Sequence, residues 1–94
     1  MFNPVSYVSM VRASLRGDAL KIATVLAGHA DNEGEFDGAG RWLSRYVGEA
    51  AGLKPKEAEA AFSKLRSFGF VALVARGDST IQRPARYALT GWSS

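Results

Sequence analysis

Apolar residues recur every three or four positions over the first thirty residues, the spacing of helices that bury one side. Pro4 is favoured at a first helical position and Gly17 at a helix end, so a first helix is predicted over residues 4–16. Asp18 can cap a second helix that continues to Ala30. The positions predicted to be buried are Val5, Val8, Val11 and Leu15, then Leu20, Ala23, Val25, Leu26 and Ala30.

Residues 31–40 interrupt this pattern with four acids and three glycines, which predicts a surface loop with a short strand around Phe36. The helical spacing then returns from Arg41 to Gly52 and again from Pro55 to Gly69, with a short turn between the two helices. The apolar positions expected to pack inward are Trp42, Leu43, Tyr46, Val47 and Ala50, then Ala58, Ala61, Phe62, Leu65 and Phe68.

After Gly69 the helical spacing gives way to the pattern of a β-hairpin. Residues 70–76 are rich in β-forming side chains, and residues 77–80 have the composition of a turn. Residues 81–90 return with apolar side chains on one side, at Ile81, Tyr87 and Leu89. Pro84 cannot donate a backbone hydrogen bond, so we expect the returning strand to have an open edge there.

Length and composition agree with one small domain of mainly α structure with a C-terminal β-hairpin, an α+β fold. Of the 94 residues, 47% are hydrophobic and 22% charged, as in folded globular proteins. Without cysteine the chain has no disulfide, thiolate zinc site or cysteine nucleophile. No apolar run approaches the roughly 20 residues that cross a bilayer, and a cytoplasmic setting is expected. The predicted parts are a first helix over 1–17, a three-helix core over 18–69 and a hairpin over 70–90.

Charge is distributed unevenly along the chain. Residues 1–40 hold three basic and five acidic side chains, a net charge of −2, whereas residues 41–94 hold nine basic and four acidic ones, a net charge of +5. Basic surfaces are drawn to polyanions because binding releases the counterions of phosphate backbones. The second half therefore favours a polyanionic partner.

The segment from Arg41 to Thr90 combines a helix, a glycine-containing turn, a second helix and a hairpin, and in this it resembles the winged helix-turn-helix family. It is most similar to small regulatory or replication-associated domains of bacteria, plasmids and phages. The residues at the positions of the family pattern are Ala50, Ala51, Gly52 and Leu53, then Ala58, Ala61, Phe62 and Leu65, then Gly69 and Phe70. Small side chains at Ala50 and Ala51 would let the two helices approach each other, with Leu53 filling the corner.

The resemblance implies a protein that binds double-stranded DNA without catalysis, in the regulation of transcription, excision or replication. The helix over about residues 55–68 would enter the major groove, whose width of about 12 Å admits one helix, and the hairpin over 76–86 would contact flanking backbone as a wing. The residues implied to contact DNA are Lys54, Lys56, Glu57, Ala60, Ser63 and Lys64 on the helix and Arg76, Arg83 and Arg86 in the wing.

Two features depart from the family pattern. Lys54 stands where the family often has a Ser or Thr cap, and a lysine can contact phosphate but caps a helix poorly. Glu57 and Glu59 place negative charge in the first turns of the helix, which favours the helix dipole but opposes DNA phosphate. Glu57 could still accept a hydrogen bond from a cytosine amino group.

Other functions stay open at this point. A winged-helix module could bind a host or replication protein through Glu57 and Glu59 or through the first helix. The valine stripe of that helix could also join two copies, because family members commonly bind DNA as dimers. The plain alternatives are that the three lysines lie on a solvated helix face and that the hairpin arginines guard an edge strand against aggregation.

Catalysis and metal binding find little support in the sequence. The chain shows no clustered acids, bases or metal ligands of the kind an enzyme needs. Glu33, Glu35, Asp37 and Gly38 fall at the first, third, fifth and sixth places of a calcium loop, but the twelfth is Ser44, where such loops need a glutamate. No metal or other cofactor is expected. His29, the only histidine, should interact with the last carbonyls of the second helix.

Overall fold

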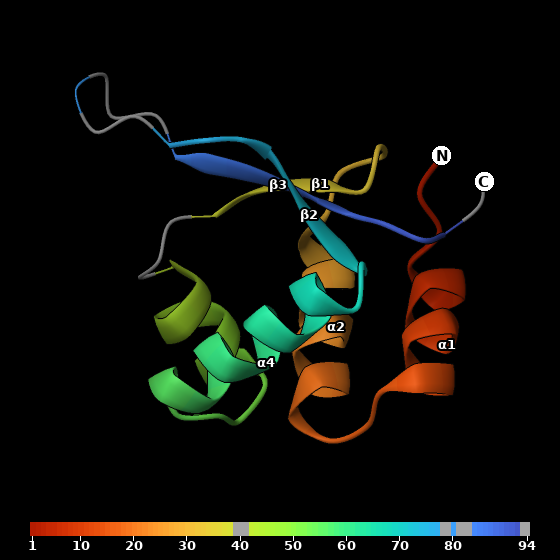
Figure 1. Cartoon of the computed structure of the whole chain (residues 1–94), viewed down its shortest axis with the longest axis horizontal. Coiled ribbons are helices and arrows are strands. Elements are labelled where there is room, and N and C mark those ends of the chain that lie inside the picture. The colour runs from red at the N-terminus through yellow and green to blue at the C-terminus, as the bar shows by residue number, and fades with distance from the viewer. Residues whose placement is uncertain (39–41, 78–79, 81–83, 93–94) are drawn as a thin grey trace.

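The computed structural model of the chain describes residues 1–38, 42–77, 80 and 84–92 and has an α+β fold (Figure 1). The strands of the described residues form one antiparallel sheet in the order β1-β3-β2, and the helices lie on one side of it (Figure 1). The elements in chain order are α1 (Pro4–Ser14), α2 (Asp18–His29), β1 (Glu35–Gly38), the π-helix η1 (Trp42–Val47), α3 (Gly48–Ala50), α4 (Pro55–Ser67), β2 (Val71–Ala75) and β3 (Ala85–Leu89).

The first helix begins where the sequence predicts, but its buried side differs from the predicted valine stripe. Asn3 caps α1 by accepting a hydrogen bond from Ser6 N–H at 3.1 Å. Val5 is 75% exposed, so its assignment to the core was wrong, and the buried side runs instead through Tyr7 and Val11. The Tyr7 hydroxyl donates to Phe70 O at 2.8 Å, and burial raises the pKa of this phenol above its ordinary value. Tyr7 thus fastens α1 to the start of the hairpin.

The second helix follows the predicted pattern except at its first residue. Gly17, with φ of 70°, occupies the N-cap position, and Asp18 is the first helical residue without a side-chain cap bond. The predicted cap at Asp18 was therefore wrong, although its carboxylate still lies at the positive end of the helix dipole. The buried residues of α2 are Ala19, Ile22, Ala23, Leu26 and Ala27, whereas Leu20, Val25 and Ala30 are half-buried.

The third predicted helix is the least regular one. Most of it is wound as the π-helix η1, whose hydrogen bonds join residues five apart, so α-helical spacing does not decide which side chains turn inward. Val47 is buried, but Tyr46 is 64% exposed and Ala50 is exposed, against the prediction for both. The close approach to α4 occurs at Gly48 instead of Ala50, because a Cβ on Gly48 would lie 2.9 Å from that of Ala58. Arg41 lies outside the described residues.

The turn before α4 matches the prediction. Gly52 adopts a left-handed conformation with φ of 73°, and half-buried Leu53 packs against the core. The inward side of α4 is Ala58, Ala61, Phe62 and Leu65, as predicted. Phe68 is 51% exposed and was wrongly placed in the core, because α4 ends at Ser67 and the Phe68 ring stacks on Phe70 instead.

The sheet contains the predicted hairpin and the predicted strand around Phe36. Contrary to the open edge expected at Pro84, β3 is the central strand and pairs with both β1 and β2. Pro84 lies just before β3, where its missing N–H costs no ladder hydrogen bond. The edge strands of this sheet are β1 and β2, and a bulge lies between Leu73 and Ala75 in the pairing of β2 with β3. Ile81 lies outside the described residues.

Candidate nucleic-acid interface

The exposed side of α4 carries the predicted helix contacts. Since four apolar residues of α4 are buried, the opposite side of the helix must face water. All six predicted residues of this region are exposed and belong to α4 or its N-cap: Lys54, Lys56, Glu57, Ala60, Ser63 and Lys64. The fold therefore brings these side chains together on one surface.

The start of α4 explains the role of Glu57. Lys54 is the N-cap residue and makes no side-chain cap bond, as expected for lysine. Glu57 compensates, because its Oε1 accepts a hydrogen bond from Lys54 N–H at 2.9 Å. One carboxylate oxygen of Glu57 thus closes the first turn of α4, which leaves the other oxygen for any base contact.

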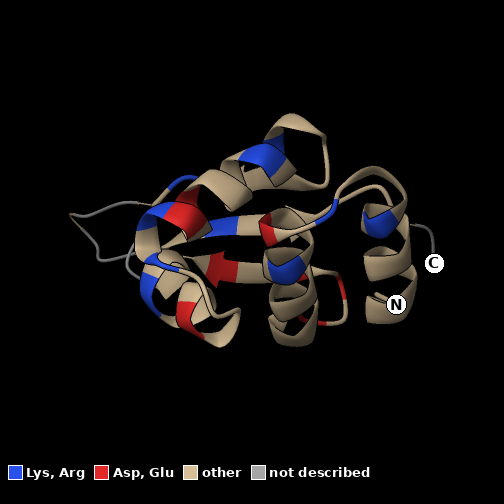
Figure 2. Cartoon of the chain, turned by 90° about the horizontal axis from the view of Figure 1, so that it is seen from below, with Lys and Arg blue, Asp and Glu red and all other residues tan. Residues whose placement is uncertain are grey.

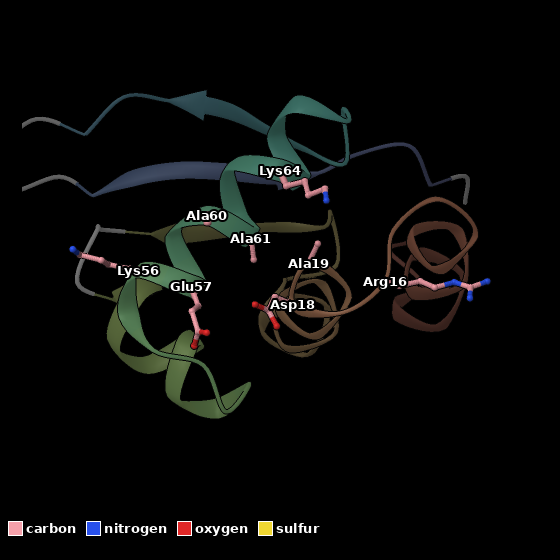
Figure 3. A pocket seen from close by; sticks show the side chains of 8 residues that line it. All are labelled: Arg16, Asp18, Ala19, Lys56, Glu57, Ala60, Ala61 and Lys64. Carbon is pink, nitrogen blue, oxygen red and sulfur yellow. The ribbon is translucent and has the colours of Figure 1, made fainter.

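An open groove of about 500 Å³ lies between α4 and the start of α2 (Figure 3). The carboxylates of Asp18 and Glu57 point into this groove, whereas the side chains of Lys56 and Arg16 extend away from it on opposite sides (Figure 3). Ala19, Ala60 and Ala61 supply its apolar lining. Because the side chains that point into the groove are acidic, the groove does not suit a phosphate. The basic side chains beside the groove can still reach a polyanion that passes over it.

Arg16 is a candidate contact that the sequence analysis missed. It lies in the turn between α1 and α2, inside the half of the chain with net negative charge, yet it borders the same groove as Lys56 and Lys64. The other two basic residues among residues 1–40 are Arg12, in the last turn of α1, and Lys21, near the start of α2. Figure 2 looks onto this end of the molecule, with basic segments on α1, α2 and α4.

Four of the five acids of residues 1–40 lie beyond the opposite end of α2, whereas the fifth, Asp18, is the first residue of this helix. Asp31, Glu33, Glu35 and Asp37 follow the C-terminus of this helix, whereas the bases of the same half flank its N-terminus. The sequence alone could have predicted this separation of basic from acidic residues, from their positions relative to the two ends of the predicted second helix. A charge count over linear halves conceals it.

Arg86 lies in an ionic cluster on the far face of the sheet. Its Nε donates to Glu35 Oε1 at 2.8 Å, Nη1 to Asp37 Oδ1 at 2.8 Å, and Nη2 to Asp31 Oδ2 at 2.6 Å. The hydrogen bonds to Asp37 and Glu35 raise the pKa of Arg86 above its ordinary value. Successive side chains of a strand alternate between faces, so Arg86 points away from α4, whose Phe62 contacts Tyr87.

Asp31 orders the loop that the sequence predicts as a surface loop. Its Oδ1 accepts hydrogen bonds from the N–H groups of Glu33 and Glu35, both at 2.9 Å. The bond from Glu35 N–H, followed by that from Glu33 and the charge of Arg86, holds the pKa of Asp31 below its ordinary value. The acidic loop is therefore tied to β3, and the three paired acids serve the fold.

The other wing residues are placed only in part. Arg76 directly follows β2 and is exposed, while Arg83 lies outside the described residues. Both stay predictions. The ring of His29 meets Trp42 edge-on at 5.8 Å, which ties the end of α2 to η1.

Metal sites, membrane spans and relatives add no further assignment. Within the described ranges, no group of three or more His, Cys, Asp or Glu side chains could hold a metal ion. None of the helices that the structure describes has the length and apolar character needed to span a membrane. Comparison of the chain with protein-family models, with curated proteins and with solved structures found no match.

Proposed function

We propose that this chain is a winged helix-turn-helix protein that binds double-stranded DNA without catalysis, with α4 in the major groove. The observation that carries the proposal is the exposed side of α4, where Lys54, Lys56 and Lys64 are free of ion pairs with described residues. Together with its N-cap, α4 has four basic and two acidic side chains, a net charge of +2. A convex cationic helix fits a groove bordered by phosphates.

The position of α4 in the fold supports the same proposal. Gly48 lets α3 approach Ala58 closely, and the turn at Gly52 and Leu53 leads directly into α4. The buried side of α4 packs on α2 and the sheet, so the exposed side projects from the molecule. The hairpin of β2 and β3 follows directly and supplies the element that would act as a wing.

Duplex binding as a function of salt tests the proposal. For about five phosphate contacts, log K should fall with log salt with a slope of roughly −4 to −5. Fluorescence anisotropy with a labelled random-sequence duplex measures the slope, and selection from random duplexes identifies a preferred site. Absence of binding to any duplex at low salt refutes the proposal.

A protein partner is the second candidate function, favoured by a different surface. An open groove of about 370 Å³ between α1 and α2 is lined partly by Val5, Val8, Ala27 and Gly28, and Val5 is largely exposed. Such a surface suits a host protein, a replication protein or a second copy of the chain. Recovery of a specific partner from nuclease-treated lysate, lost on Val5→Ser substitution, would support this function.

A further inference from the structure

Arg66 occupies a position on α4 that the sequence analysis did not consider. It lies in the last turn of α4 and is exposed. Its guanidinium carbon lies 5.7 Å from the centroid of the Tyr87 ring. Among the residues that the structure describes, the ion pairs all belong to Arg86, so Arg66 keeps its charge available for a ligand.

The aromatic ring beneath Arg66 is itself held in place. Tyr87 stacks on Phe36 of β1 with centroids 5.7 Å apart and meets Phe62 of α4 edge-on at 5.0 Å. A guanidinium that rests on a fixed ring loses less side-chain freedom on binding than one that moves freely in water. Tyr87 is therefore a positioning residue for Arg66.

Arg66 and Lys64 border two different hollows on the two sides of α4. Lys64 lines the groove shared with α2, whereas Arg66 lines a hollow of about 380 Å³ shared with Val71–Leu73 of β2. Ser63 also lines this second hollow, while the Ser67 hydroxyl donates to Lys64 O within the helix. The exposed side of α4 thus has cations on both flanks, with Lys56 and Lys64 toward α2 and Arg66 toward β2.

A helix in the major groove lies between the two phosphate backbones of the duplex, one on each side. We propose that Arg66 binds a phosphodiester of the backbone on the wing side of α4, while Lys64 meets the opposite strand. This inference rests on the proposed DNA-binding function. It assigns to Arg66 the wing-side contact expected of Arg86, which lies on the far face of the sheet with three carboxylates. Guanidinium groups suit this role because they bind phosphate oxygens in a bidentate manner.

The test compares Arg66→Gln with Lys64→Gln and Arg86→Gln on a duplex obtained by site selection. Arg66 is exposed, so its substitution should leave the fold intact, which thermal melting verifies. Loss of one contact should reduce the magnitude of the salt slope by about 0.9 and weaken binding about eightfold at 0.1 M salt. Lys64→Gln should have the same effect, and Arg86→Gln should leave the slope unchanged.

Duplexes with neutral methylphosphonate linkages in one strand at a time test the assignment of strands. Neutral linkages in the wing-side strand should weaken duplex binding by the wild type but cause little further loss of binding by Arg66→Gln. Neutral linkages in the other strand should weaken binding by the wild type but cause little further loss of binding by Lys64→Gln. An unchanged slope for Arg66→Gln, with Lys64→Gln shallower, overturns the inference and leaves the proposed function standing. Dependence of both variants on the same strand overturns the two-flank assignment. If the wild type binds no duplex, the proposed function itself fails.

Discussion

The far face of the sheet and the exposed side of α4 are both rich in charge, but they use it differently. On the sheet, one arginine makes ion pairs with three carboxylates within 2.6–2.8 Å. On α4 and its N-cap, three lysines and Arg66 lack such pairs among the described residues. The pairing of charges in the fold, more than their number in the sequence, therefore decides which of them can contact a ligand.

The pairing on the sheet follows from strand register. Asp37 lies opposite Arg86 in the β1–β3 ladder, and Glu35 lies two residues away on the same face. Asp31 joins them from the loop before β1, so the cluster holds one base and three acids, a net charge of −2. This face would repel a polyanion, whereas the α4 side would attract one.

Among the substitutions considered, removal of two unpaired lysines of α4 should change duplex binding the most. The double variant Lys56→Ala, Lys64→Ala should weaken duplex binding about 60-fold at 0.1 M salt, because each lost phosphate contact removes about 0.9 from the salt slope. Anisotropy titrations at several salt concentrations measure both quantities. Affinity and slope equal to those of the wild type would place the interface elsewhere.

The position of α4 depends on its close packing against Gly48 of α3. Gly48→Ala should destabilise the protein by about 1–3 kcal/mol, because the new Cβ would meet Ala58 Cβ at 2.9 Å in the closely packed interior. Urea unfolding measures the change. Gly28→Ala is a matched control, since a Cβ at Gly28, also within a helix, meets nothing within 4 Å.

Ala58→Gly in the Gly48→Ala background should restore part of the loss, because it removes the atom that the new Cβ meets. Equal stability of Gly48→Ala and wild type would show that the α3–α4 approach can relax. The presentation of α4 would then not depend on a glycine at this position.

The sequence predicts the helices and strands better than it predicts which charged side chains form ion pairs. The period of α4 identifies its buried side because four apolar residues repeat with α-helical spacing, and the left-handed turn follows from Gly52. The same reasoning fails at Tyr46 and Ala50, because the π-helical winding of η1 is not encoded in apolar spacing. Nothing in the sequence distinguishes the charge of Arg86 from that of Arg66. Only the pairing of β1 with β3 shows that Arg86 forms ion pairs with acidic side chains.

Charge removal at Glu57 should have a smaller effect of opposite sign. Glu57→Gln keeps a side-chain oxygen that can accept from Lys54 N–H, so the stability of the fold should change little. Loss of a negative charge beside the DNA should tighten duplex binding by a few-fold. Weaker binding to the selected site alone would instead identify Glu57 as a reader of a cytosine amino group.

Acidification should reduce the stability that the ionic cluster of Arg86 contributes, because the pKa of Asp31 is lowered in the folded protein. A lowered pKa contributes stability that is present above the unfolded value of about 3.8 and is lost as pH falls through the folded value. Asp31→Asn should therefore be less stable than wild type at pH 7, with the difference shrinking as the pH falls below about 3.8. Urea midpoints across this range measure it, and a constant difference would contradict the linkage.

The smallest expected effect is that of Arg86→Gln on duplex binding. The Arg86 guanidinium is engaged by three carboxylates on the face of the sheet away from α4, so its removal should change the duplex affinity by less than about twofold and leave the salt slope unaltered. The same variant should melt at a lower temperature, because it leaves three carboxylates near one another without their counter-charge. A shallower slope for Arg86→Gln would mean that the cluster opens when DNA binds, and the division between paired and available charge would then not hold in the complex.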